Sequence, residues 1–391
     1  MYKISVNLPI SREPWQIPFG ERKARAIQSL RSGKRLAIMI YHHADTSTFR
    51  YRCYNVMQAL DNSSTWDSIY FFVDEITLLD DLIPQASICV LVRLKWEHTI
   101  GELIHRAKRH EIPVLYDIDD LVCDIRYLTM VTNTLNVHFG SEVDYDFWFS
   151  YISRMEYTAS NIDGFITTNK FLGNKLEERF GKPYQIIVNS LNQEQIKASE
   201  ICRTIKSRLT TSRPFTIGYF SGTPSHINDF RTVSAEIACF LQDFPDSVLQ
   251  VVGFMEFPKS MEELIRKKRI QYVSLVDFVE LQKLIAQVDV NIVPLVQNIF
   301  TNCKSELKFF EAAIVETPTI AVPTFTYRSA IVDGKNGFLC QPGEMYNRLM
   351  QLHDDESLAR CISQQARTDC LERYAGETIC NMIESAYNSF V

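Results

Sequence analysis

The sequence lacks the excess of basic residues that a general nucleic-acid binder needs. Its 391 residues include 41 Lys and Arg against 47 Asp and Glu, a formal net charge of −6 at pH 7. The short basic runs at residues 22–25 and 266–269 are interpreted as solvated helix faces. A weak attraction of these runs to acidic lipid headgroups is the alternative. We therefore expect no nucleic-acid partner.

Long apolar runs are also missing. No stretch approaches the roughly 18 apolar residues of a membrane-spanning helix. Residues 1–20 include Arg12, Glu13, Pro14 and Pro18 and lack the apolar core of a signal peptide. The ten cysteines form no Cys-x-x-Cys pair and no zinc-like cluster, which favours reduced thiols. We expect a soluble cytoplasmic protein, with transient contact at the inner face of the membrane as a secondary expectation.

Short apolar runs alternate with helix-like segments along the chain. Such runs are typical of strands buried on both faces of a parallel sheet, and alternation with helices indicates right-handed βαβ units. The length suits two domains. The first set of expected strands comprises residues 35–41, 88–93, 113–117, 164–168 and 184–188, with a helix at 99–110. The second set comprises residues 215–220, 247–252, 289–294 and 318–323, followed by a helical tail at 363–390.

These patterns predict an α/β protein of two Rossmann-like, doubly wound domains. Residues 1–35 are interpreted as an extension and residues 36–197 as the first domain. The stretch from Gln193 to Arg213 is polar and charged, so residues 198–213 are interpreted as a linker. Residues 214–371 form the predicted second domain. No Gly-x-Gly-x-x-Gly follows a first strand in either half, which disfavours a dehydrogenase.

The loop after residue 220 is the first candidate binding site, because open parallel sheets bind ligands outside the carboxyl ends of their strands. Gly222 would let the backbone approach a ligand closely, and neighbouring N–H groups could hold a phosphate. The alternative is an ordinary glycine turn. The candidate donor-binding residues of this loop are Ser221, Gly222, Thr223 and His226.

Residues 302–313 form the second candidate site. If they are helical, Lys304, Lys308 and Glu311 fall within roughly 60° of one another. Leu307, Phe310 and Ile314 would make the adjacent apolar stripe that packs on the sheet. Two ammonium groups beside a helix N-terminus suit a diphosphate, and Glu311 could accept hydrogen bonds from ribose hydroxyls. The alternative is a solvent-facing lysine pair with a surface salt bridge.

The chain resembles retaining glycosyltransferases of family 4, in a branch associated with bacterial surface polysaccharides. The strongest resemblance lies in residues 217–230, 289–295, 304–312, 317–323 and 333–338. Looser agreement lies in residues 49–52, 116–121 and 187–192. The resemblance implies the GT-B fold, in which two Rossmann-like domains face a central cleft. It also implies that the C-terminal helix, residues 372–391, crosses back onto the N-terminal domain.

The resemblance assigns the donor sugar nucleotide to the C-terminal domain. Glu311 matches the second glutamate of the family's Glu-x7-Glu motif, which usually binds the ribose, whereas Cys303 occupies the position of the first. Glu306 is the candidate substitute for that missing carboxylate. Backbone N–H groups of Ser305, Glu306 and Leu307 match the turn that cradles the pyrophosphate, and the loop ending at Phe278 resembles the one that frames the base. Glu316 stands where glycine is common.

The N-terminal domain is expected to hold the acceptor. In many relatives a histidine lies near the reacting sugar, and Asp119 occupies the matching position. Asp119 or Asp120 could accept a hydrogen bond or a proton from the acceptor hydroxyl. Helix capping is the bland alternative. A metal site on the Asp-x-Asp pattern of residues 117–120 is another, although we expect no metal.

His43, Arg50 and Arg52 are the other candidates for the cleft. Two arginines two residues apart do not share a helix face, so at most one is expected to reach the cleft and meet a phosphate. Salt bridges at the surface or between the domains are the alternative role.

The resemblance implies transfer of a sugar, with retained configuration, from a nucleoside-diphosphate donor to a glycan or lipid-linked acceptor. We expect no cofactor. Closure of the two domains would exclude water and limit hydrolysis of the donor. A nucleotide-sugar epimerase of related fold, or a weakly catalytic scaffold in polysaccharide assembly, remains an alternative function.

Overall fold

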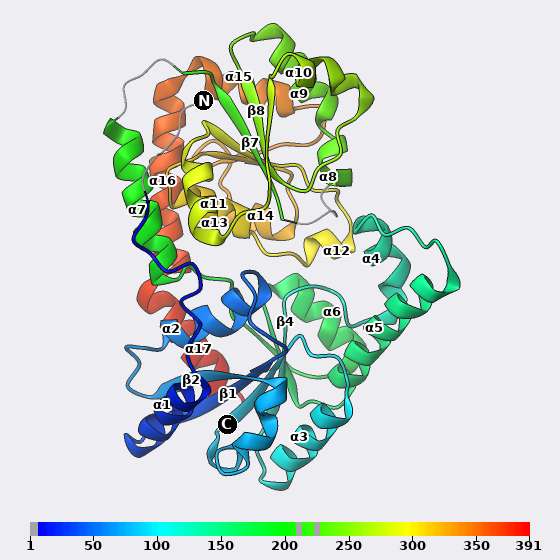
Figure 1. The fold of residues 1–391 in the computed structure, drawn as a ribbon, viewed down its shortest axis with the longest axis vertical. Helices are drawn as coiled ribbons and strands as arrows, with labels where there is room; N and C mark the ends of the chain where they lie inside the picture. The colour runs from blue at the N-terminus through cyan, green and yellow to red at the C-terminus, as the bar shows by residue number, and fades with distance from the viewer. Residues whose placement is uncertain (1–6, 209–212, 223–226) are drawn as a thin grey trace.

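The computed structural model describes residues 7–208, 213–222 and 227–391. It contains two six-stranded parallel sheets, each with helices on both faces, arranged one above the other (Figure 1). The predicted class, two Rossmann-like α/β domains, is confirmed.

The first sheet has the order β2-β1-β3-β4-β5-β6. Strand β2 therefore lies on one side of β1, and β3 to β6 follow one another on its other side. Its strands are β1 (Arg35–Tyr41), β2 (Trp66–Phe72), β3 (Ile88–Val92), β4 (Val114–Ile118), β5 (Gly164–Thr167) and β6 (Tyr184–Ile186). Strands β1, β3 and β4 are buried nearly end to end, as continuous apolar runs in a parallel sheet require.

Helices and short turns connect these strands. The α-helices are α1 (Phe19–Arg31), α2 (Asn55–Ala59), α3 (His98–Arg109), α4 (Leu128–Thr134), α5 (Glu142–Ser160) and α6 (Lys170–Phe180). A π-helical turn, η1 (Arg50–Tyr54), leads into α2. The 3₁₀ turns are η2 (Val73–Leu79), η3 (Ile83–Gln85) and η4 (Ile125–Tyr127).

The second sheet has the order β12-β11-β10-β7-β8-β9. Its strands are β7 (Thr216–Ser221), β8 (Val248–Gly253), β9 (Ile270–Val273), β10 (Val290–Val293), β11 (Thr319–Ala321) and β12 (Phe338–Leu339). The helical segments around it are α8 (Ile227–Arg231), α9 (Ser234–Asp243), η6 (Lys259–Met261), α10 (Glu262–Arg266), α11 (Phe278–Ala286), α12 (Ile299–Asn302), α13 (Leu307–Ala313), α14 (Phe325–Ala330) and α15 (Met345–Asp354).

Most of the stretch interpreted as a linker is helical. Residues Gln193–Arg208 form helix α7, which packs along α11 of the second domain. Ser199 on α7 donates a hydrogen bond to Gln282 on α11 at 2.9 Å. The stretch was interpreted as a linker because it is mostly polar, but α7 has a narrow buried stripe that includes Ala198 and Cys202. A helix that joins two domains needs only such a stripe when its other faces meet solvent.

The chain returns to the first domain at its C-terminus. Helix α16 (Glu356–Tyr374) packs on α13, and helix α17 (Gly376–Asn388) packs on α2 and β6. The indole of Trp66 in β2 donates a hydrogen bond to Asn388 at 3.0 Å. Gly376 takes a φ of +63° at the junction, a conformation that glycine adopts without strain. The predicted crossing of the C-terminal helix is therefore present.

The N-terminal extension docks on the first domain and also reaches the second. Helix α1 lies against β2, and its Arg22 pairs with Glu75 of η2 at 2.6 Å. Upstream of α1, the Trp15 ring contacts Phe49 of the first domain and Phe278 of the second, at centroid distances of 6.1 and 5.8 Å. Residues before α1 thus touch both domains.

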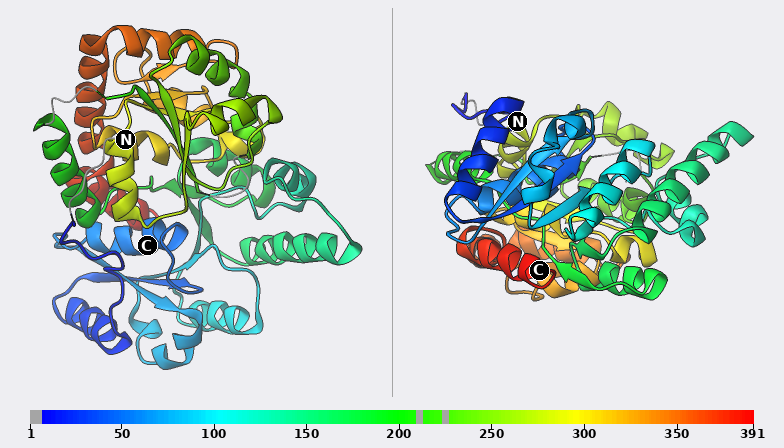
Figure 2. Two further views of the ribbon diagram at one scale, coloured as in Figure 1. Left: turned by 45° about the horizontal axis from the view of Figure 1, so that its top comes forward. Right: turned by 90° about the horizontal axis from the view of Figure 1, so that it is seen from below.

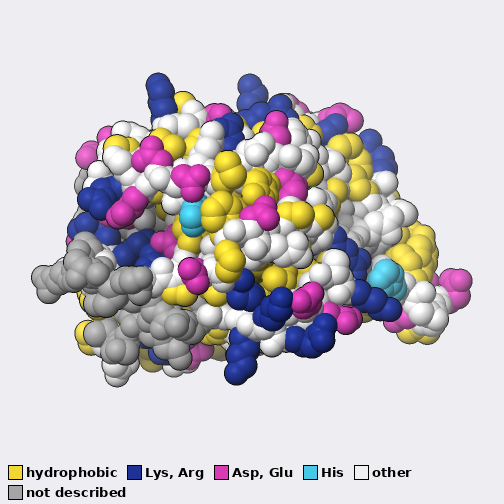
Figure 3. Space-filling model, turned by 90° about the horizontal axis from the view of Figure 1, so that it is seen from above, with side chains coloured by type: hydrophobic (Ala, Val, Ile, Leu, Met, Phe, Trp, Pro, Cys, Tyr) yellow, Lys and Arg dark blue, Asp and Glu magenta, His cyan; other side chains and the backbone are white. Residues whose placement is uncertain are grey.

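The surface carries charges of both signs. In the view from above, Lys and Arg side chains are interspersed with Asp and Glu, and yellow and magenta side chains meet at the projecting right-hand end (Figure 3). None of the helices in the described part of the chain is long and apolar enough to cross a membrane.

Candidate active site

A cavity of about 490 Å³ lies between the two domains, at the carboxyl ends of both sheets. This is where ligands bind to open α/β sheets. The first domain contributes the loop after β1, η1, and the residues that follow β3 and β4. The second contributes the ends of β7, β8 and β10, the start of α11, and α13.

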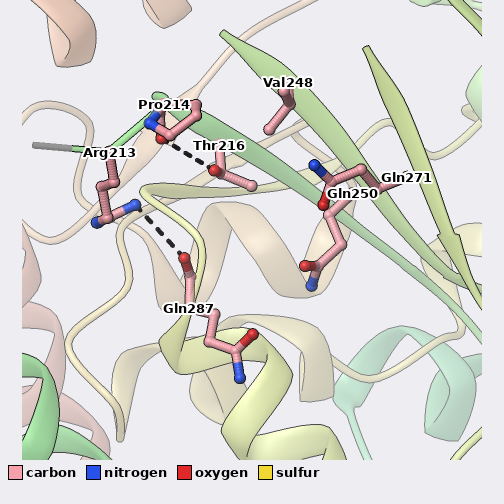
Figure 4. A pocket seen from close by; sticks show the side chains of 7 residues that line it. All are labelled: Arg213, Pro214, Thr216, Val248, Gln250, Gln271 and Gln287. Atoms are coloured by element: carbon pink, nitrogen blue, oxygen red, sulfur yellow. Dashed lines mark hydrogen bonds between the residues drawn. The ribbon is translucent and has the colours of Figure 1, made fainter. Parts of the chain in front are cut away.

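A second pocket, of about 10 Å³, lies at the opposite, amino-terminal edge of the second sheet (Figure 4). The side chains of Arg213, Gln250 and Gln271 line it, and Arg213 is paired with Asp289. Its volume corresponds to about one water molecule. The cavity between the domains is therefore the candidate active site.

Lys304, Lys308 and Glu311, the predicted donor-binding residues, all line the cavity, although the helix that carries them is shorter than assumed. Helix α13 begins at Leu307, and Lys304 lies in the connection that follows α12. Leu307 lines the cavity as well, whereas Phe310 is fully buried. The expected side-by-side placement of the three charged groups thus arises from a loop and a helix together.

The two lysines meet carboxylates from both domains. Lys304 Nζ lies 3.6 Å from Asp120 across the cavity and 4.5 Å from the centre of the Phe300 ring. Lys308 is half-buried, and desolvation lowers the pKa of its ammonium to about 8, against the opposing effect of Asp229. Lys304 lowers that pKa further. A desolvated ammonium with a lowered pKa gains stability when an anionic ligand binds beside it.

Glu311 is held by two residues of the other domain. Tyr51 donates a hydrogen bond to Oε1 at 2.5 Å, and Arg50 Nη2 lies 3.4 Å from the same oxygen. Within the described residues, no hydrogen bond reaches Oε2 of Glu311. One carboxylate oxygen therefore joins the two domains, and the other has no hydrogen-bond partner among the described residues.

Only one of the two arginines of η1 reaches the cavity, as predicted. The Arg50 guanidinium lies over the rings of Tyr51 and Phe278, at 4.0 and 4.9 Å, and lines the cavity. Arg52 points into the first domain, where it makes two hydrogen bonds to Asp117, of 2.8 and 2.9 Å. The π-helical turn allows this divergence, and such turns often occur at functional sites.

Asp119 and Asp120 line the cavity and share one partner, Arg93, that the sequence analysis did not find. Arg93 Nη1 donates to Asp119 at 3.0 Å, and Arg93 Nη2 lies 3.4 Å from Asp120. Thr48 donates a second hydrogen bond to Asp119 at 3.2 Å. Arg93 follows β3 with a φ of +47°, a strained conformation of the kind that collects at functional sites.

The Asp-x-Asp pattern does not present its carboxylates to one point. Asp117 is buried against Arg52, whereas Asp119 and Asp120 face the cavity. Among the described residues, no cluster of three or more His, Cys, Asp or Glu side chains is arranged to hold a metal ion.

Several other candidates lie at the cavity wall, namely Ser221, Gly222, Phe278 and Ser305. Thr223 and His226 lie outside the described residues. Ser305 accepts a hydrogen bond from Asn189 of the first domain at 2.9 Å. Thr46, Ser47, Asn189 and Tyr327 also line the cavity and were not predicted. They lie in loops or on an unremarked helix, where no spacing pattern marks them.

Besides Arg52, three further residues that the sequence singled out are not at the cavity wall. His43 is exposed on the loop after β1. Cys303 is fully buried, and its carbonyl accepts a hydrogen bond from Asn169 at 2.7 Å. Glu306 turns away and accepts a hydrogen bond from Tyr374 at 2.7 Å. Burial raises the pKa of Glu306, although the Tyr374 bond opposes that rise. Glu306 is therefore engaged in the packing of α16 and does not replace the missing first glutamate.

Glu316 has a φ of +54°, in the left-handed region that favours glycine. It follows α13, where its N–H bonds to the carbonyl of Ala313 at 3.0 Å. Its side chain lies 3.3 Å from Arg203 on α7. The positive φ explains why glycine is common at this position. In this chain the position is occupied by a glutamate, which pairs with Arg203.

Comparison with known proteins agrees with this geometry. Residues 215–355 match the family described as Glycosyl transferases group 1. Comparison with curated proteins gave no match. Anabaena HepE in complex with UDP is similar in structure, with a TM-score of 0.61 and 13% identity over 91% of this chain and 100% of that one.

Two further structures share the fold. Sucrose-phosphate synthase from Thermosynechococcus elongatus has a TM-score of 0.58 and 14% identity over 91% of this chain and 99% of its own. A complex of Staphylococcus aureus TarM with Fondaparinux, alpha-GlcNAc-glycerol and UDP has a TM-score of 0.55 and 14% identity, over 80% of this chain and 58% of its own. The two-domain architecture is that of GT-B glycosyltransferases, and the second domain, which begins with β7, carries the group 1 match.

Proposed function

We propose that this protein is a glycosyltransferase that moves a sugar from a nucleoside-diphosphate donor to a glycan or lipid-linked acceptor. The observation that carries the proposal is the cavity between the domains. There Lys304, Lys308 and Glu311 of the second domain line the same cavity as Asp119 and Asp120 of the first, and Lys304 lies 3.6 Å from Asp120. Such a cavity offers cationic groups to a leaving diphosphate and hydrogen-bond acceptors to sugar hydroxyls.

The donor is proposed to bind along the second domain. Lys304 and Lys308 would stabilise the negative charge that develops on the diphosphate as the glycosidic bond breaks. Because these two ammonium groups supply positive charge at that point, we propose that the transfer needs no divalent metal. The free Oε2 of Glu311 would accept hydrogen bonds from the ribose, and Phe278 with Val276 would border the base.

The acceptor is proposed to bind along the first domain, beside Asp119 and Asp120. Arg93 and Thr48 fix Asp119 in place, so its carboxylate can orient an acceptor hydroxyl without reorganising. Retention of configuration, and a place in surface polysaccharide or glycoconjugate synthesis, are proposed on the resemblance to family 4. UDP is the first nucleotide to test, because the HepE structure contains it.

The test is a thermal-shift screen of UDP-, GDP-, dTDP- and ADP-linked sugars, with and without Mg²⁺. A ligand that binds only the folded protein raises its melting temperature. We expect one nucleotide family to stabilise the wild type without metal and to have little effect on a Lys304→Ala/Glu311→Ala variant. Lys335→Ala, which removes an exposed lysine elsewhere on the second domain, is the matched control. If no sugar nucleotide shifts the wild type, the donor site is wrong.

A second assay separates transfer from isomerisation. With the stabilising donor, a transferase releases free nucleoside diphosphate, and an acceptor accelerates that release. Conversion of the donor into an isomeric sugar nucleotide, with no release, would contradict the proposal.

A further inference from the structure

Helix α5 projects from the side of the first domain (Figures 1 and 2). Of the fourteen large hydrophobic side chains that are exposed in the described residues, six lie on α5 or just before it. They are Phe139, Val143, Tyr145, Phe147, Phe149 and Tyr157. Exposed apolar groups that gather in this way mark a binding surface.

Three rings of α5 form an ordered row, which we call the aromatic track: Phe147, Trp148 and Tyr151. Phe147 and Tyr151 are nearly parallel, with an interplanar angle of 16° and centroids 6.4 Å apart. The Trp148 ring meets the other two edge-on, at 6.0 Å from each. Phe147 is 63% exposed, and the other two rings are half-buried. The track therefore runs from solvent toward the body of the domain.

The inner end of the track lies near the candidate active site. Burial lowers the pKa of Arg93, but Asp119, Asp120 and the Tyr151 phenol raise it, and the net effect is a rise. Arg154 of α5 donates a hydrogen bond to the carbonyl of Trp96 at 2.8 Å, on the segment after β3 that also carries Arg93. Leu135, at the end of α4 beside α5, lines the cavity. The helix that carries the aromatic track therefore packs on α4 and on the segment after β3, each of which provides a residue of the cavity wall.

The charges on α5 limit what this surface can bind. We place the side chains around the helix axis at about 100° per residue. On one side of the helix, Glu142 and Asp146 then lie between two groups of rings, with Tyr145 and Phe149 in one group and Phe147 in the other. On the other side, Asp144 falls between Tyr151 and Trp148. No broad apolar face is free of carboxylates, and α5 carries only one basic residue, Arg154. Membrane-surface helices instead have one apolar face and a polar face rich in Lys and Arg.

We propose that the aromatic track binds a neutral oligosaccharide segment of the acceptor and directs its growing end toward Asp119. This inference rests on the proposed function. The C–H faces of sugar rings carry a slight positive charge and stack on the negative faces of aromatic rings. Hydroxyl groups at the sugar rim can donate to the carboxylates beside the rings. Those same carboxylates repel glycans that contain uronic acids, so the surface selects neutral chains.

The test uses the full chain on an array of neutral and uronic-acid-containing oligosaccharides, followed by fluorescence titration of the bound glycans. We expect binding of neutral glycans only. Phe147→Ala should weaken it about tenfold, as loss of one stacked ring implies. Phe149→Ala, on the other side of the same helix, is the matched control and should change it less than about twofold. Phe147→Tyr keeps a ring and should bind normally, which separates stacking from folding.

Stabilisation by UDP is measured on every variant, because Phe147 lies outside the donor site. Two results would contradict the proposal when UDP stabilises all variants: neutral glycans that bind wild type and Phe147→Ala equally, or neutral glycans that bind neither protein. In both cases the aromatic track is not the acceptor site. Binding to phosphatidylcholine vesicles, or a dimer in sedimentation, that is lost in Phe147→Ala would also overturn the proposal, since a bilayer or a second copy would then occupy the track. If none of the four nucleotide families stabilises any variant, the donor site fails by itself.

Discussion

The ammonium of Lys308 is the group whose ionisation should control donor binding. Burial lowers its pKa to about 8 in the free protein, and a bound diphosphate would raise it again. Binding then takes up a proton once the pH exceeds about 8. UDP affinity should therefore be steady below about pH 7 and fall by up to about tenfold per pH unit above pH 8. Isothermal titration calorimetry at several pH values, in buffers of different ionisation enthalpy, measures both the affinity and the proton uptake.

Lys308→Arg is the control for this prediction. A guanidinium stays protonated throughout this range, so the arginine variant should lose the alkaline fall even if its affinity at pH 7 is lower. The same fall in both proteins would show that another group titrates, and the assignment of Lys308 to the diphosphate would lose its main support.

Glu316 allows a test of backbone strain at one residue. Its φ of +54° disfavours side chains with a Cβ by about 1–2 kcal/mol, and its ion pair with Arg203 is half-exposed and contributes at most about 1 kcal/mol. Both Glu316→Gly and Glu316→Ala remove the ion pair, but only glycine removes the strain. The glycine variant should be more stable than the alanine variant by about 1 kcal/mol in urea unfolding. Equal stability of the two variants would mean that the strain is small.

Among the secondary-structure elements, the buried central strands were the most predictable. β1, β3 and β4 are apolar along most of their length, and the bounds predicted for each agree with the structure within about two residues. β2 was not predicted because Asp67 and Ser68 interrupt its apolar run. In the structure Asp67 is buried and accepts hydrogen bonds from Arg25 and Ser29 of α1. A buried carboxylate of this kind can be recognised only when its distant partners are known.

The residues of the candidate site differ in the same way: some are marked by a local sequence pattern, and others depend on contacts with distant residues. Lys304, Lys308 and Glu311 could be predicted because they lie close together in the sequence, within residues 304–311, and a single local segment brings them to one wall of the cavity. Arg93 and Tyr51 could not, because their roles depend on contacts with Asp119 and Glu311 that chain folding creates. Only the placement of both domains shows that Glu311 already has partners across the cavity.

The buried pair of Arg52 and Asp117 anchors η1 to β4 and should be important for stability. Arg52 also donates to the carbonyl of Ile187 at 2.7 Å, so it ties η1 to the segment after β6. Arg52→Met leaves the Asp117 carboxylate buried without its partner, which should cost about 3–5 kcal/mol of the free energy of unfolding. The double variant Arg52→Met/Asp117→Leu removes both charges and should recover part of that loss. Urea unfolding of the two variants and wild type tests this, and equal loss in both variants would contradict it.

Across the whole molecule, polar and aromatic contacts hold the two domains together around the cavity. Tyr51 and Arg50 reach Glu311, and Asn169 donates to the carbonyl of Cys303. At the rim, Trp15 contacts Phe278, which also borders the cavity. The structure therefore represents a closed arrangement whose contacts are distributed among several separate segments of the first domain. Such an arrangement can open when one set of contacts is lost.

Trp15 provides the test of that arrangement, because it belongs to the N-terminal extension and lies outside the cavity wall. Trp15→Ala removes the ring contacts with Phe278 and Phe49, so the open form should become more populated. Small-angle scattering should show a larger radius of gyration than for wild type, and UDP affinity should fall because binding must restore closure. Saturating UDP should return the radius toward the wild-type value. Arg12→Ala removes an exposed ion pair to Asp277 on the same segment and should leave both quantities unchanged. A Trp15→Ala protein with the wild-type radius and full affinity would show that the extension contributes to folding but not to closure.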